Sequence, residues 1–116
     1  MLHHVALEVP TALVQACVEF YESLGFTETA PPETLRGRAR WVERGGTQIH
    51  LLLVDGRPRG GHFALVVADH DAVVGALRRA GHAPEARFAH WGAARAYVRD
   101  PAGNLVELTA APPPDA

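Results

Sequence analysis

The sequence repeats a short apolar segment that begins with histidine, and this duplication limits what the chain can fold into. The first copy is residues 4–9 (HVALEV) and the second is residues 62–67 (HFALVV). Apolar and β-branched residues predominate in both copies, so both are predicted to be strands. Side chains two positions apart share a strand face, which puts each histidine on the face of the alanine after it. The chain is therefore predicted to contain two similar modules.

A second repeated feature places a metal-ligating residue in each module. His50 comes four residues after Gly46, and Glu107 comes four residues after Gly103. The separation from the histidine at the start of each module is nearly the same in the two cases. Histidine and carboxylate side chains on neighbouring strands bind divalent Zn, Ni, Mn or Fe(II). A single strand histidine is more often a hydrogen-bonded core residue, but four such positions in duplicated register favour a metal site at His4, His50, His62 and Glu107.

The hydrophobic patterns predict the same order of elements, βαβββ, in both modules. Strands are expected at 3–9, 26–30, 38–44 and 47–54, and again at 62–68, 83–87, 95–99 and 104–109. Apolar stripes of helical spacing lie between the first two strands of each module, with Thr11 and Asp69 as N-caps and Gly25 and Gly81 as C′ residues. The predicted fold class is α+β. Module one covers 1–54, a turn-rich linker 55–61, module two 62–110 and a proline-rich tail 111–116, all within a single domain.

Composition excludes several functions. The chain of 116 residues has a formal charge of −2, which gives no general attraction to nucleic acid or to an anionic membrane. All eleven basic residues are arginine, so a lysine Schiff base is impossible. The single cysteine, Cys17, lies in a helical apolar stripe and is predicted to be a core thiol. Without an intrachain disulfide, a signal-peptide pattern or a long apolar run, a cytoplasmic location is expected.

Polar residues on the strands provide candidates for binding and proton transfer. Arg95 and Tyr97 share one face of their strand, and Arg38 and Arg40 are expected at the equivalent positions of module one. If this is the ligand face, the arginines would hold an anionic substrate and Tyr97 would donate a proton or a hydrogen bond. The alternative is an exposed strand face. Trp41 falls in the opposite register and is expected in the core.

Several motifs together resemble the glyoxalase/bleomycin-resistance/dioxygenase group, the vicinal oxygen chelate superfamily. They are HVALEV at the start, FYESLGF at 20–26, HFAL at 62–65 and DPAGNLVEL at 100–108. The resemblance covers nearly the whole chain. It implies sheets that curl into a cup around one metal, with His4, His50, His62 and Glu107 as ligands. It also implies a small-molecule substrate and a homodimer.

The resemblance leaves the reaction open. The leading hypothesis is a small metal-dependent lyase or isomerase that acts on an oxygen-rich substrate. The alternatives are an Fe(II) extradiol-type dioxygenase and a drug- or metabolite-binding protein without catalytic activity. As the only carboxylate among the expected ligands, Glu107 is also the expected general base. Glu8 shares the face of His4 and is a competing base.

Overall fold

The computed structural model describes residues 2–58 and 62–112, which divide into two compact units. The first unit comprises residues 2–58 together with the turn Asp100–Asn104, and the second comprises residues 62–99 and 105–112. Each unit contains one βαβββ module with a mixed four-stranded sheet, so the predicted fold class is confirmed. Parts of the predicted linker and tail, residues 59–61 and 113–116, lie outside the described residues.

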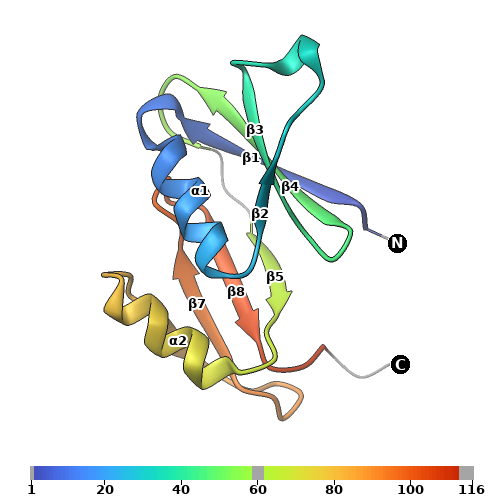
Figure 1. Ribbon diagram of the computed structural model, residues 1–116. Coiled ribbons are helices and arrows are strands. Elements are labelled where there is room, and N and C mark those ends of the chain that lie inside the picture. The colour runs from blue at the N-terminus through green and yellow to red at the C-terminus, as the bar shows by residue number, and fades with distance from the viewer. Residues whose placement is uncertain (1, 59–61, 113–116) are drawn as a thin grey trace. The chain divides into compact units, whose positions relative to one another are not determined.

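The first unit is a sheet covered on one face by a helix (Figure 1). Its sheet order is β1-β4-β3-β2, with β1 parallel to β4 and the other pairs antiparallel. The buried side chains of α1 include Cys17, Val18, Phe20 and Tyr21, which confirms the predicted apolar stripe. The elements in chain order are β1 (His4–Pro10), η1 (Thr11–Leu13), α1 (Val14–Ser23), β2 (Thr27–Thr29), η2 (Glu33–Leu35), β3 (Ala39–Arg44) and β4 (Thr47–Val54).

The second unit has the same topology, with sheet order β5-β8-β7-β6. Asp69 caps its helix as predicted, since its Oδ1 accepts a hydrogen bond of 3.1 Å from the backbone N–H of Ala72. Thr11, by contrast, begins a short 3₁₀ helix, and no side-chain cap precedes it. The elements of this unit are β5 (His62–Val66), α2 (His70–Arg79), β6 (Glu85–Arg87), β7 (Arg95–Arg99) and β8 (Leu105–Thr109).

Strand pairing separates each sheet into a polar face and an apolar face. In the first unit Ala6 pairs with His50 and His50 with Trp41, so His4, His50 and Trp41 share one face. In the second unit Ala64 pairs with Glu107 and Glu107 with Tyr97, which is the same arrangement. The opposite faces carry core residues, including Val42, Ile49 and Leu51 in the first unit and Ala96, Val98, Val106 and Leu108 in the second.

The predicted faces of Trp41 and Arg40 are wrong, because the two hairpin turns differ in length by one residue. The β3–β4 turn has two residues, Gly45 and Gly46, between the paired residues Arg44 and Thr47. The β7–β8 turn has three residues between Asp100 and Asn104, whose backbones are hydrogen-bonded. An alignment of the two modules that matches Gly46 with Gly103 is therefore one residue out of register on β3. A slip of one residue moves every side chain to the other face of a strand. Trp41, rather than Arg40, is the counterpart of Tyr97.

The turn Asp100–Asn104 is organised by one buried carboxylate in the first unit. Asp100 is 3% exposed, and its Oδ2 accepts a 2.8 Å hydrogen bond from the Tyr21 hydroxyl. The backbone N–H groups of Ala102 and Asn104 donate to Oδ1 at 3.0 and 2.8 Å, and Asn104 Nδ2 donates to Oδ2 at 3.1 Å. Asn104 Nδ2 also reaches the carbonyl of Glu8 at 3.2 Å. Four donors thus satisfy a carboxylate that water does not reach.

Neither described helix could span a membrane, since both are far too short.

Candidate functional site

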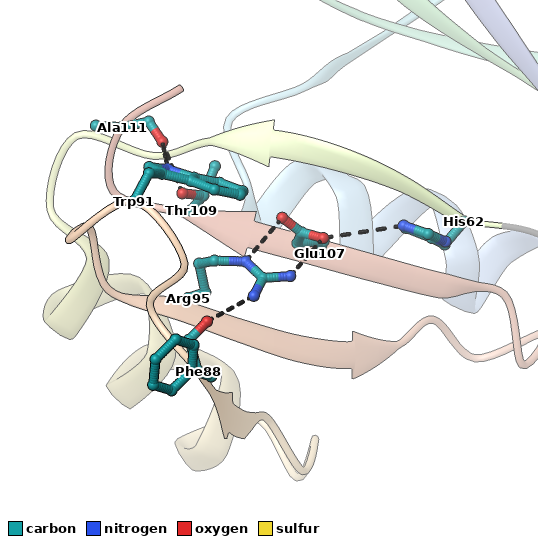
Figure 2. A network of polar contacts seen from close by, with 7 residues as sticks. All are labelled: His62, Phe88, Trp91, Arg95, Glu107, Thr109 and Ala111. Atoms are coloured by element: carbon teal, nitrogen blue, oxygen red, sulfur yellow. Dashed lines mark hydrogen bonds and ion pairs between the residues drawn. The ribbon is translucent and has the colours of Figure 1, made fainter. Parts of the chain in front are cut away.

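His62 and Glu107 form a pair on the polar face of the second sheet (Figure 2). His62 lies two residues before Ala64, the strand partner of Glu107, so the two side chains are diagonal neighbours across β5 and β8. His62 Nε2 is 3.9 Å from Glu107 Oε1. The His62 side chain is 48% exposed, whereas that of Glu107 is only 8% exposed. One partner is therefore open to solvent and the other is held within the protein.

Arg95 holds the Glu107 carboxylate from the other side. Its Nε donates to Oε2 and its Nη2 to Oε1, both at 3.1 Å, which is a bidentate ion pair. Its remaining nitrogen, Nη1, donates to the carbonyl of Phe88 at 2.6 Å. Hydrogen bonding to Glu107 raises the pKa of Arg95 above its usual value and outweighs the opposing effect of burial. Each of its three nitrogens thus makes a hydrogen bond within the chain, which uses three of its five N–H groups. Binding of an anionic substrate by Arg95 stays a prediction.

An aromatic loop closes over this ion pair. The Trp91 ring centroid lies 5.0 Å from the Arg95 guanidinium carbon, a cation–π distance. Trp91 Nε1 donates to the Ala111 carbonyl at 2.9 Å, and Thr109 Oγ1 donates to the same oxygen at 2.7 Å. Figure 2 shows these groups around the Arg95–Glu107 pair. Sequence reasoning did not identify Thr109, although its position two residues after Glu107 on one strand was a usable signal.

Tyr97 lies at the centre of the polar face, as its register predicts. Its ring centroid is 6.0 Å from that of His62, 4.7 Å from the Arg87 guanidinium carbon and 5.7 Å from that of Arg95. A groove of about 620 Å³ lies beside it at the β6–β7 edge. The groove is lined by Ala83, Glu85, Arg87, Tyr97, Val98, Arg99 and Leu105. Arg87, which sequence reasoning missed, lies nearer the Tyr97 ring than Arg95 does.

The first unit carries the second predicted pair on its own polar face. The imidazole of His50 lies between two rings, with centroid distances of 4.0 Å to His4 and 3.8 Å to Trp41. Its Nε2 is 2.8 Å from Gln48 Oε1. Burial lowers the pKa of His50, and the nearby His4 and His3 lower it further. A neutral imidazole, the form that binds metal, is therefore favoured.

The two arginines expected to bind substrate in the first unit lie elsewhere. Arg38 is exposed and precedes β3. Arg40 is on the helix-facing side of the sheet, where its Nε and Nη2 donate to Glu28 at 2.7 and 2.8 Å and its Nη1 donates to Gln15 at 2.8 Å. Arg40 therefore contacts α1 and lies on the face of the sheet opposite to His50.

The competing base, Glu8, is half-buried on the face of His4.

The donor chemistry of the two pairs fits a divalent transition metal. Imidazole nitrogens and one carboxylate are the ligand types used by Zn, Ni, Mn and Fe(II). Within residues 2–58 and 62–112, no group of three or more histidine, cysteine, aspartate or glutamate side chains is close enough to hold a metal ion. The candidates instead occur two by two, His4 with His50 and His62 with Glu107.

Comparison with known families decides the relationship. A family model described as a glyoxalase-like domain matches residues 4–109, nearly the whole chain. The chain belongs to the glyoxalase-like domain family. Its predicted place in the glyoxalase/bleomycin-resistance/dioxygenase superfamily is thereby confirmed. A search of curated protein sequences finds no significant match to this glyoxalase-like chain.

Solved structures agree with this family. A protein from Bacillus anthracis, described as a member of the glyoxalase family, is 27% identical with a TM-score of 0.85, and the match covers 94% of this chain and 93% of that one. A superfamily member from Sphaerobacter thermophilus is 26% identical, with a TM-score of 0.71 and coverage of 94% and 95%. A lactoylglutathione lyase from Agrobacterium tumefaciens shares the fold at 20% identity, with a TM-score of 0.75 and coverage of 94% and 92%.

Proposed function

We propose that this glyoxalase-like protein is a metal-dependent lyase or isomerase that acts on a small substrate with two neighbouring oxygen atoms. The supporting observation is that the two units carry their metal-ligating residues in the same register. In each unit a histidine lies two residues before the alanine that pairs with the second ligand, His50 or Glu107. Core packing alone does not require that pattern on the polar face of both sheets. The ligand set would be His4, His50, His62 and Glu107.

In this proposal a bound Zn, Ni, Mn or Fe(II) ion would polarise the two substrate oxygens and make the adjacent carbon acidic. Glu107 acts as the general base: the C–H bond breaks, the proton moves to a carboxylate oxygen, and the electron pair stays on the substrate. In an isomerisation Glu107 returns the proton to the neighbouring carbon. Tyr97, on the same face, donates a hydrogen bond to the substrate. The groove beside Tyr97, with Arg87 in its wall, would hold an anionic part of the substrate.

The second candidate is a binding protein that sequesters a small molecule without chemistry. The bidentate Arg95–Glu107 pair favours it, because both oxygens of the proposed base already accept hydrogen bonds. In that case Tyr97 and Trp91 would provide aromatic contacts for the ligand.

Metal analysis of protein purified without a histidine tag tests the main proposal. About one equivalent of metal should be found in the wild type and much less in His62→Ala and Glu107→Ala, whereas His82→Ala, outside both pairs, should match the wild type. Equal metal content in the wild type and in His4→Ala/His62→Ala would refute the site. Metal-free protein that still binds an aromatic ligand stoichiometrically would favour the binding protein, and oxygen uptake with a catechol would favour the dioxygenase.

Solvent-deuterium exchange tests the role of Glu107 as the base. Metal-loaded Glu107→Gln should not exchange deuterium into a bound substrate analogue, while Glu8→Gln should. Full exchange in Glu107→Gln would refute the assignment, and loss in Glu8→Gln would transfer the role to Glu8.

We also propose that the protein is a homodimer. The outer strands of the two sheets are β1 with β2 and β5 with β6, and association of two chains is one way in which proteins cover outer strands. Light scattering at high micromolar concentration should give twice the chain mass, and a monomer would count against the proposal.

A further inference from the structure

The Glu107 carboxylate is buried and its charge is already balanced. The side chains of Arg95 and Glu107 are 7% and 8% exposed. An ionised carboxylate at such a position is costly unless an opposite charge and hydrogen-bond donors accompany it. Arg95 supplies both, with two N–H groups on the two oxygens. The chain therefore needs no external cation to stabilise Glu107.

The same geometry makes Arg95 a competitor for the oxygen nearest His62. Glu107 Oε1 lies 3.9 Å from His62 Nε2 and 3.1 Å from Arg95 Nη2. A cation shared by His62 and Glu107 would use this oxygen. It would then lie within a few ångströms of the guanidinium, and like charges at that range repel strongly in a partly dry site.

Arg95 cannot easily move aside, because the surrounding loop holds it. Its Nη1 donates to the Phe88 carbonyl at 2.6 Å, and the Trp91 ring lies beside the guanidinium at 5.0 Å. Trp91 is itself held by its bond to the Ala111 carbonyl. Moving the guanidinium would break its hydrogen bonds to both Glu107 and Phe88.

We infer that Arg95 is a positioning residue that acts as an internal counter-ion of Glu107: it orients the carboxylate toward His62, weakens divalent-metal binding there, and lets the metal-free protein stay folded. This inference rests on the proposed metal site. Under this inference Arg95 lowers the metal affinity of the site. Its strand position had instead predicted a role in substrate binding.

The test compares Arg95→Gln, which keeps a hydrogen-bond donor but loses the charge, with Arg87→Gln as the matched control. Arg87 lies on the same face, over the ring of Tyr97, and pairs with Glu85 rather than Glu107. Full-length protein is titrated with Co²⁺, whose visible absorption reports ligand number and geometry, and Zn²⁺ affinity is obtained by competition. Arg95→Gln should bind both metals at least about tenfold more tightly than the wild type. A tenfold change in affinity is near the low end of the coupling energies measured between close charged groups. Arg87→Gln should match the wild type.

Thermal unfolding gives a second measurement. In EDTA, Arg95→Gln should unfold at a lower temperature than Arg87→Gln, and Zn²⁺ should restore its stability by neutralising Glu107. Adding Glu107→Gln to Arg95→Gln should abolish both the tighter binding and the restoration. If Arg95→Gln is unfolded in EDTA, refolding by Zn²⁺ supports the inference, and failure to refold overturns it.

The outcomes separate this inference from the proposed function. Wild-type Co²⁺ binding that depends on His62, with no tighter binding by Arg95→Gln, overturns the inference and leaves the metal site standing. Binding that appears only in Arg95→Gln and depends on His62 supports the inference and overturns the metalloenzyme proposal. Absence of Co²⁺ binding in both proteins overturns both.

Discussion

Removing the Tyr21 hydroxyl should destabilise the first unit by about 2 kcal/mol. Tyr21 is fully buried, and its hydroxyl donates at 2.8 Å to Asp100, which is itself 3% exposed. A hydrogen bond to a charged group contributes roughly 1.5–3 kcal/mol of net stability. Tyr21→Phe leaves three of the four donors on Asp100, which places the cost near the lower half of that range. The lost volume is a single oxygen, so no large cavity adds to it.

Urea unfolding followed by tryptophan fluorescence measures this loss. Tyr21→Phe should lower the urea midpoint by roughly 1 M or more, and the melting temperature by roughly 6–12 °C, without a change in slope. Asp100→Ala should cost more, about 3–5 kcal/mol, because it leaves the Tyr21 hydroxyl and two backbone N–H groups without their acceptor. Tyr97→Phe, at the other tyrosine, should cost less than about 1 kcal/mol, since that side chain is only half-buried. A loss below about 0.5 kcal/mol in Tyr21→Phe would refute the view that the Asp100 network stabilises the unit.

Three further predictions follow from single groups. Burial raises the pKa of the Cys17 thiol to about 12, so DTNB at pH 8 should label it only in denaturant, and rapid labelling of native protein would contradict its core position. Asp69→Ala removes the acceptor for the Ala72 N–H and should cost about 1 kcal/mol in urea unfolding, while an unchanged midpoint would show that the cap contributes nothing. Burial lowers the pKa of His50 below 6.5, so the unfolded chain binds this proton more readily and stability should fall as the pH drops below that value. Unfolding in EDTA should show a weaker acid dependence in His50→Gln, and an identical dependence would exclude His50 as the source.

Much of the local structure was predictable because it depends on short-range geometry. Glycine is favoured where the backbone must turn to positive φ, and both predicted C′ residues, Gly25 and Gly81, have a φ of 92°. Strand alternation placed His62 on the face of Ala64, and the duplicated motifs predicted two modules of the same topology. These features follow from side-chain periodicity and backbone sterics, which act over a few residues and are readable in any sequence.

Pairing across strands was not determined by those patterns. The misplacement of Trp41 came from the β3–β4 turn, which is one residue shorter than the β7–β8 turn. The sequence contains both turns, but their hydrogen-bonded closing pairs exist only once the strands meet. Because a single residue of slip exchanges the two faces of a strand, a small error in turn length became a complete error in side-chain direction.

The partner of Arg95 was likewise decided only by tertiary structure. Alternation correctly placed Arg95 on the polar face, where an anionic ligand was one of its expected partners. A long, flexible guanidinium pairs with whichever acceptors the neighbouring strands and loops bring within reach, and here these are Glu107 and the Phe88 carbonyl. Sequence determined the chemical groups available to this face. Strand pairing and the 88–94 loop determined that the buried carboxylate of Glu107 meets an internal cation, because a buried charge is stable only where the fold supplies its counter-charge.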